Sequence, residues 1–251
     1  MIIKWDVTIP ELSGDTPRKG YVYLPESYQN NPDRHYPVLY MFDGHNVFFD
    51  SDATYGKSWG MKEYMDRTGK ELIIVGIACN EQGMRRLNEY SPLDFDYEPV
   101  GHIEGLGKVY MEWMLRELKP YIDEEYRTLP DREHTYIAGS SMGGLMSLYA
   151  VCCYNSVFSK AACLSTSLWV KIEEGLKLLS SGAMDKDTWI YMDYGSEELS
   201  NHPGCEEGLV WAFQMLLSKG TKPMLRIVPG GTHCEASWEK QIPIFMECLG
   251  I

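Results

Sequence analysis

One short stretch in the middle of the chain constrains the fold more than any other. A short apolar run begins at His134, residues 139–143 read Gly-Ser-Ser-Met-Gly, and the following residues carry apolar side chains at helical spacing. A strand that turns into a helix within a few residues leaves no room for a Cβ atom at Gly139 or Gly143. Such a turn also holds its central residue, Ser141, in a strained conformation with the hydroxyl exposed. The stretch therefore predicts a serine nucleophile at a sharp strand-to-helix turn.

Apolar runs on both sides of this turn predict a mostly parallel sheet. Besides the run before Gly139, the expected strands cover residues 2–9, 20–24, 36–42, 71–78, 160–164, 188–193 and 224–228. The expected helices cover residues 59–67, 105–126 with an interruption near Pro120, the segment after Ser141, 206–218 and 242–249. We expect the first two strands to form an antiparallel edge. Alternating strands and helices predict the α/β class and an α/β-hydrolase fold, with about eight strands covered by helices on both faces.

Length and composition fit a single domain spanning residues 1–251. The chain has 44% hydrophobic and 24% charged residues, which is ordinary for a globular protein. Its length is within the range that α/β folds fill as one domain. The formal net charge of −13 disfavours nucleic acid and anionic membranes as partners, because both are negatively charged. The sequence leaves the oligomeric state open.

The cysteines and the N-terminus favour a cytoplasmic location. Seven cysteines are an odd number, and none has Cys-x-x-Cys spacing, so we expect reduced thiols, with no disulfide framework and no zinc site. Residues 1–7 lack the charged-then-apolar pattern of a secretion signal, and no apolar run approaches the length of a membrane span. We also expect no cofactor.

The loop after the strand at residues 36–42 reads Asp43-Gly44-His45-Asn46. A polar, glycine-containing loop at the carboxyl end of a buried strand is where an open α/β sheet builds its site. In α/β-hydrolases this loop supplies one oxyanion-hole amide, and the residue after the nucleophile supplies the other. This assigns the backbone amides of His45 and Met142. A metal site of His45 with Asp43 and Asp50 is an alternative that no compact ligand spacing supports.

A serine hydroxyl needs a general base, and the base needs a carboxylate to fix its tautomer. The α/β-hydrolase chain order is serine, acid, histidine. Two histidines follow Ser141: His202 precedes a proline, whereas His233 follows the last expected strand in a glycine-rich loop, where the fold places its base. The acid belongs after the strand at 188–193, where Glu198 is favoured over Asp193 and Glu197.

Two further segments are candidates for the substrate site. Residues 80–99 form a long irregular stretch of the kind that often serves as a lid or a substrate wall, although a surface excursion without a role fits it as well. Trp169 follows the strand at 160–164 and is a candidate wall of the acyl pocket. The alternative for a tryptophan at such a position is a place in the core, which is the commoner outcome.

Four motifs together resemble the esterase D type "putative esterase" family. They are Tyr-Met-Phe-Asp-Gly-His-Asn before residue 47, the segment around Ser141, Gly-Ser-Glu-Glu at 195–198, and Gly-Gly-Thr-His at 230–233 with Trp238 following. The resemblance covers residues 21–249. It implies Ser141 as nucleophile, His233 as base, Glu198 as acid where many relatives have Asp, and the amides of His45 and Met142 as oxyanion hole.

The resemblance implies a serine carboxylesterase but does not fix its ester. The family contains S-formylglutathione hydrolases, feruloyl and acetylxylan esterases, enterochelin esterases and mycolyltransferases. It favours a feruloyl or acetyl ester of a carbohydrate, so the expected partner is a small-molecule or oligosaccharide ester. The alternatives are an acyltransferase or thioesterase of the same fold, and a binding protein that keeps the fold without activity.

Overall fold

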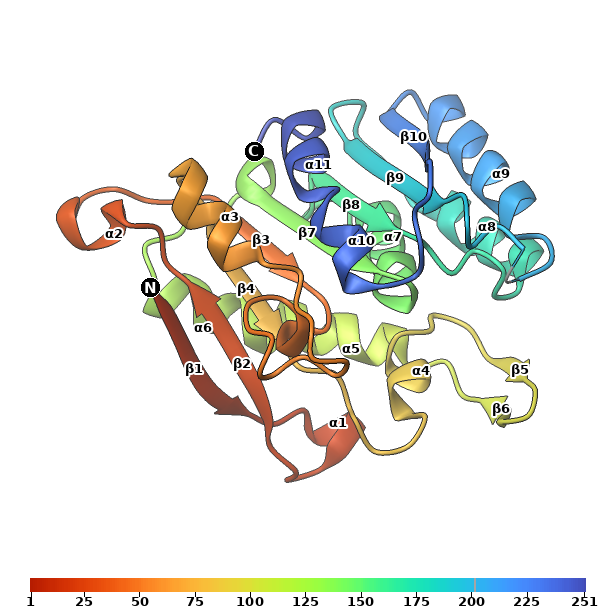
Figure 1. Ribbon diagram of the computed structural model, residues 1–251, viewed down its shortest axis with the longest axis horizontal. Helices are drawn as coiled ribbons and strands as arrows, with labels where there is room; N and C mark the ends of the chain where they lie inside the picture. The colour runs from red at the N-terminus through yellow and green to blue at the C-terminus, as the bar shows by residue number, and fades with distance from the viewer. Residues whose placement is uncertain (201) are drawn as a thin grey trace.

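The computed structural model describes residues 1–200 and 202–251, and in these residues eight strands form one sheet (Figure 1). In sheet order the strands are β1 (Ile2–Val7), β2 (Arg18–Tyr23), β4 (Ile73–Ile77), β3 (Val38–Met41), β7 (Thr135–Ser140), β8 (Lys160–Leu164), β9 (Trp189–Gly195) and β10 (Lys222–Val228). β1 pairs with β2 and β2 with β4 in antiparallel fashion, whereas β4, β3, β7, β8, β9 and β10 run parallel. The predicted antiparallel edge and mostly parallel sheet are therefore confirmed.

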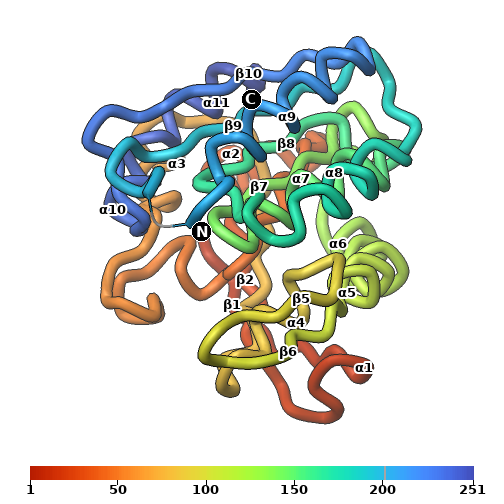
Figure 2. Tube along the Cα trace, turned by 90° about the vertical axis from the view of Figure 1, so that its right-hand side faces the viewer, coloured from red at the N-terminus to blue at the C-terminus, as the bar shows by residue number. Residues whose placement is uncertain are grey.

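Helices cover both faces of this sheet. One face carries α5 (Gly107–Trp113), α6 (Lys119–Glu125), α7 (Met142–Cys153), α8 (Ile172–Ser181) and α9 (Cys205–Ser218), and the other carries α3 (Met61–Thr68), α10 (Glu235–Glu239) and α11 (Ile242–Cys248). Figure 2 shows α3 and α10 on one side of the strands and α6, α7 and α8 on the other. Short helices α1 (Pro10–Ser13), α2 (Ser27–Asn30) and α4 (Arg85–Glu89) lie in the connections.

The strand sequences explain why both faces are covered. Side chains alternate between the two faces of a strand, so a strand that is apolar throughout needs a core on each side. In β3, Val38 and Tyr40 belong to the core under α5 to α9, whereas Leu39 and Met41 belong to the core under α3, α10 and α11. The same alternation continues along β4, β7, β8 and β9. The central strands therefore lie between two apolar cores.

Residues 80–103 are more ordered than the sequence suggests. They contain α4 and a small hairpin, β5 (Phe95–Tyr97) with β6 (Gly101–Ile103), which pairs antiparallel outside the main sheet. Apolar anchors hold this excursion, since Tyr90, Phe95 and Ile103 are buried. Runs of three residues are too short for a period-two pattern to predict, so the hairpin is missed by sequence reasoning.

The expected break near Pro120 takes the form of a π-helical turn. Met114–Leu118 separate α5 from α6, and Pro120 lies in the first turn of α6. A proline has no amide hydrogen and clashes with the preceding turn, so the turn widens while the helical path continues. Sequence reasoning also misses α8 and α10. No helix in the described part of the chain is long and apolar enough to cross a membrane.

Candidate active site

Ser141 lies at the turn between β7 and α7. Its backbone has φ 58° and ψ −123°, a region that residues with a side chain rarely adopt. A Cβ atom on Gly139 would lie 2.6 Å from the carbonyl oxygen of Gly143, and one on Gly143 would lie 2.9 Å from Cβ of Phe42. The close packing expected at both glycines is thus present. The turn is at the carboxyl end of a central parallel strand, where open α/β sheets form their sites.

His233 and Glu198 meet beside Ser141, although 35 residues separate them in the chain. His233 lies in the loop after β10, Glu198 lies in the turn after β9, and Nδ1 of the imidazole is 2.5 Å from Oε2 of the carboxylate. The two loops touch through glycines, because a Cβ atom on Gly195 would lie 2.3 Å from the carbonyl oxygen of Gly231. Parallel strands β9 and β10 therefore bring these loops to one edge of the sheet.

The second oxygen of Glu198 is held by uncharged donors. Oε1 accepts hydrogen bonds from the hydroxyl of Ser165 at 2.6 Å and from the amide of Gly195 at 2.8 Å. The Ser165 oxygen accepts in turn from the indole N–H of Trp238 at 2.8 Å, and the Trp238 ring packs edge-on against His233. These contacts close a ring of four side chains. We call Glu198, His233, Trp238 and Ser165 the acid–base ring.

The other two candidate acids lie elsewhere. Asp193 is buried, accepts from the hydroxyl of Tyr191 at 2.8 Å and contacts the amide of Ser165. Burial raises its pKa to about 7, and the charge of Glu198 adds to this shift. Glu197 is exposed. Of the three candidate carboxylates, Asp193 lies within β9 and Glu197 and Glu198 follow it, and Glu198 is the one that contacts His233.

His45 and Met142 both stand at the start of helical turns. His45 lies in a 3-10 turn, Gly44–Asn46, and Met142 is the first residue of α7. The first amides of a helix have no acceptor inside it. Both residues are buried next to the turn that carries Ser141. Their amides are thus available as hydrogen-bond donors at this edge of the sheet.

An ion pair between buried Asp43 and half-buried Arg86 underlies the His45 turn. Nε and Nη2 of Arg86 each donate to one oxygen of Asp43, both at 2.7 Å. Burial alone would raise the pKa of Asp43, but the charge and hydrogen bonds of Arg86 outweigh it and hold that pKa below its ordinary value. Asp43 itself has a left-handed backbone, with φ 55°. The pair links α4 to the loop after β3, a contact that the sequence does not reveal.

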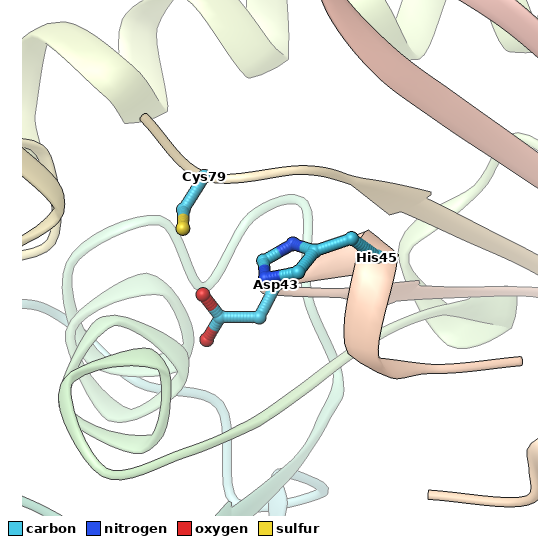
Figure 3. A group of neighbouring side chains, drawn as sticks. All are labelled: Asp43, His45 and Cys79. Atoms are coloured by element: carbon cyan, nitrogen blue, oxygen red, sulfur yellow. The ribbon is translucent and has the colours of Figure 1, made fainter. Parts of the chain in front are cut away.

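The only cluster in the described chain that resembles a metal site is a poor fit for a cation. Figure 3 shows Asp43, His45 and Cys79 converging, with donor atoms within 4.8 Å of one another. Arg86 already occupies both oxygens of Asp43, so a metal ion would meet a fixed positive charge. Asp50, the other candidate ligand, accepts from the amide and hydroxyl of Ser58 and is not part of this cluster.

Ser141 and His233 border a shared cavity of about 340 Å³. Most of its other lining side chains are polar or charged: Asp43, His45, Asn46, Thr54, Tyr55, Arg86, Ser140 and Glu235, with Cys79 and Trp238 completing the wall. Two larger hollows in the described chain share no lining residue with this cavity, whereas a third of about 410 Å³ shares His45 and Cys79 with it. The cavity combines the hydroxyl of Ser141, the imidazole of His233 and several hydrogen-bonding groups.

Trp169 is not among the residues that line this cavity. Its indole stacks on His202, with ring centres 4.1 Å apart, and packs against Tyr97 and Phe95 of the β5–β6 hairpin. Burial, and then the charge of His233, lowers the pKa of His202. His202, Trp169, Tyr97 and Phe95 therefore form an aromatic cluster near His233, which we call the Trp169 cluster. Sequence reasoning singled out Trp169 and the stretch at 80–99 separately but could not pair them.

Comparisons with known proteins agree with this fold. The sequence profile of a family described as "Putative esterase" matches residues 13–243. An uncharacterized protein of Bacillus subtilis, YbbA, is 26% identical over 187 residues, which are 72% of this chain and 69% of YbbA.

Solved structures that share the fold include a ferulic acid esterase and an IroE-like serine hydrolase. A ferulic acid esterase superposes with a TM-score of 0.72 at 21% identity, covering 100% of this chain and 97% of that one. An IroE-like serine hydrolase from Shewanella oneidensis gives 0.75 at 22% identity, covering 95% and 77%. The chain belongs to the "Putative esterase" family and is a carboxylic ester hydrolase.

Proposed function

We propose that this esterase is a serine carboxylesterase in which Ser141 is the nucleophile, His233 the base and Glu198 the acid. The hydrogen bond between His233 and Glu198, beside a cavity that His233 shares with Ser141, is the observation that carries the proposal. The strained backbone of Ser141 supports it, because such strain is typical of a nucleophile at a strand-to-helix turn.

Each residue has a definite task in the reaction. Ser141 Oγ attacks the ester carbonyl while His233 takes its proton, and Glu198 stabilises the imidazolium that forms. The amides of His45 and Met142 donate to the developing oxyanion, each contributing about 3 kcal/mol to lowering the barrier. His233 then returns the proton to the leaving alcohol, and water releases the acid from the acyl-enzyme. No step needs a cofactor.

The substrate we propose is a feruloyl or acetyl ester of a carbohydrate. The polar lining of the Ser141 cavity supports an alcohol with several hydroxyl groups, because each hydroxyl needs a hydrogen-bonding partner. The Trp169 cluster lies outside the wall of this cavity, but the charge of His233 acts on His202 within it. We propose that its rings extend the site toward an aromatic acyl group, because aromatic rings pack well against a planar phenolic acid. In this proposal Trp169 is a substrate-binding residue.

We infer a cytoplasmic location from the cysteines. All seven have free thiols, and four of them are buried as small apolar side chains. Reduced thiols in this number are usual in a reducing compartment.

A hydrolysis panel tests the function. The panel contains nitrophenyl acetate, methyl ferulate, an acetylated xylo-oligosaccharide and S-formylglutathione, with Ser141→Ala as control. We expect preference for a feruloyl or acetylated sugar ester, and loss of nearly all turnover with retained folding in the Ser141→Ala variant. Full activity in the Ser141→Ala variant would rule out Ser141 as the nucleophile. Preference for the thioester, or transfer to an added alcohol in place of hydrolysis, would redefine the reaction.

A further inference from the structure

Glu235 is a buried carboxyl group in the Ser141 cavity to which the proposed mechanism gives no task. It is 5% exposed, lies two residues after His233 and lines the cavity. Burial raises its pKa, and the charge of Asp43 adds to the shift, so no nearby cation compensates its charge in full. A buried carboxyl without an ion-pair partner costs stability, and such groups concentrate at functional sites.

One neighbour fixes the position of this carboxyl. Oε1 of Glu235 accepts from Nδ2 of Asn46 at 3.2 Å, and Oδ1 of Asn46 accepts from the amide of Thr54 at 2.9 Å. The backbone amide of Thr54 thereby orients the Asn46 side chain, so that its N–H groups face Glu235. The carboxylate also accepts from its own backbone amide, and Glu235 has no ion-pair partner among the described residues while it lines the cavity. Since two carboxylate oxygens offer about four acceptor positions, the group can still accept from a ligand.

The position of Glu235 selects which part of an ester it meets. In the proposed reaction His233 returns a proton to the leaving alcohol, so the alcohol oxygen must come within reach of the imidazole. Glu235 borders the same cavity from the next turn of the chain after His233. A group one or two atoms beyond the ester oxygen of the alcohol would therefore lie near the Glu235 carboxylate.

The chemistry of the cavity favours a hydroxyl group over a cation at this place. Arg86 lines the same cavity, but its guanidinium is already paired with Asp43, so the groups left to contact a ligand beside Glu235 are uncharged. The hydroxyls of Thr54 and Tyr55 and the amide of Asn46 are uncharged partners for a neutral polar ligand. We propose that Glu235, oriented by Asn46, is a specificity-determining residue that accepts a hydrogen bond from a hydroxyl next to the ester on the leaving alcohol. This inference rests on the proposed function.

Matched esters of one acid test it. The ethyl, 2-hydroxyethyl and 2-(trimethylammonio)ethyl esters differ in the group that would meet Glu235, and the ratio of kcat/KM for the 2-hydroxyethyl and ethyl esters isolates the hydroxyl. We expect a ratio above one in the natural protein and a fall of about tenfold in Glu235→Leu, since hydrogen bonds to charged groups are strong. Glu235→Gln keeps the shape and an acceptor for Asn46, and should give an intermediate ratio.

Controls separate this inference from the proposed function. Glu239→Gln, on the same short helix but paired with Lys57 away from the cavity, should keep the natural ratio. An equal ratio in the natural protein and both Glu235 variants, with nitrophenyl acetate still hydrolysed, would overturn the role of Glu235 alone. If the natural protein prefers the trimethylammonio ester and this preference disappears in Glu235→Gln, the group that Glu235 recognises is a cation and not a hydroxyl. If the natural protein does not hydrolyse nitrophenyl acetate at all, the proposed function itself is rejected.

Discussion

The two sides of the Ser141 cavity are held by opposite kinds of electrostatics. On the side of the proposed oxyanion hole, Asp43 and Arg86 form a two-bond ion pair whose charges cancel. On the side of the acid–base ring, Glu198 is held by the hydroxyl of Ser165 and the amide of Gly195, which carry no charge. In the described residues His233 is the ion-pair partner of Glu198.

This difference follows the work proposed for each side. The His45 turn only has to hold a backbone amide in place. The ion pair beneath the turn can do this because neither of its charges has to change during the proposed reaction. His233 has to gain and lose a proton, and a carboxylate without a permanent cation responds to that change in full. An arginine paired with Glu198 would weaken the attraction between the Glu198 carboxylate and the imidazolium of His233. The predictions below test this division, from the largest expected effect to the smallest.

The largest effect should come from removing the charge on the acid–base ring. Glu198→Gln keeps the size of the side chain but no longer stabilises the imidazolium, so kcat should fall by about 10³ to 10⁴. Steady-state hydrolysis of nitrophenyl acetate measures it. Glu197→Gln is the matched control and should keep natural turnover, because that side chain is exposed. If Glu197→Gln lost activity and Glu198→Gln kept it, the catalytic acid would be Glu197 and not Glu198.

Breaking the ion pair on the other side should mainly reduce stability. Arg86→Met leaves Asp43 buried without a counter-charge, so the free energy of unfolding should drop by about 3–5 kcal/mol. Urea denaturation measures the drop. Arg85→Met removes an exposed neighbouring arginine and should have little effect. If both variants were equally stable, the ion pair would not be the support described here.

Asp193 sharpens the comparison through pH. Its pKa is about 7 in the folded protein and near 3.8 when unfolded, so the folded state binds more protons between these values. The stability it contributes is full below about pH 4 and is lost as pH rises toward 7. Asp193→Asn should remove this dependence. The free energy of unfolding of the variant minus that of the natural protein should therefore increase by a few kcal/mol between pH 4 and pH 8. Parallel denaturation curves at all pH values would contradict the assignment.

The smallest effect should come from Ser165, a positioning residue that acts through Glu198. Ser165→Ala removes one hydrogen bond to the carboxylate and one acceptor for Trp238, so kcat should fall about tenfold with KM little changed. The loss of a donor to the carboxylate should also shift the acid limb of the kcat–pH profile, which mere loss of packing would not do. Ser167→Ala, a buried neighbour without a side-chain hydrogen bond to Glu198, should leave the profile in place.

Most of the fold could be predicted from the sequence because its signals are local. The runs at 36–42, 71–78 and 160–164 are continuous and apolar, and each forms a central strand within two residues of the expected bounds. The β5–β6 hairpin could not be predicted, since its strands have three residues each and depend on buried Phe95 and Ile103 for their place. Sequence reasoning misses helix α8 although Ile172, Leu176 and Leu179 recur there at helical spacing.

The sequence by itself determined where the main strands lie along the chain, the turn at Ser141 and the loop that carries His233, because turn glycines and apolar runs act on their immediate neighbours. The order of the strands in the sheet came from the tertiary structure. Only the tertiary structure decided which carboxylate meets His233. Asp193, Glu197 and Glu198 lie within six residues, and the choice among them depends on the contact of Gly195 with Gly231 across two strands. Tertiary packing likewise joined Arg86 to Asp43 and Ser165 to Glu198. These pairs are distant in the chain, and nothing in the local pattern distinguishes an arginine or serine that will be buried from one that will be exposed.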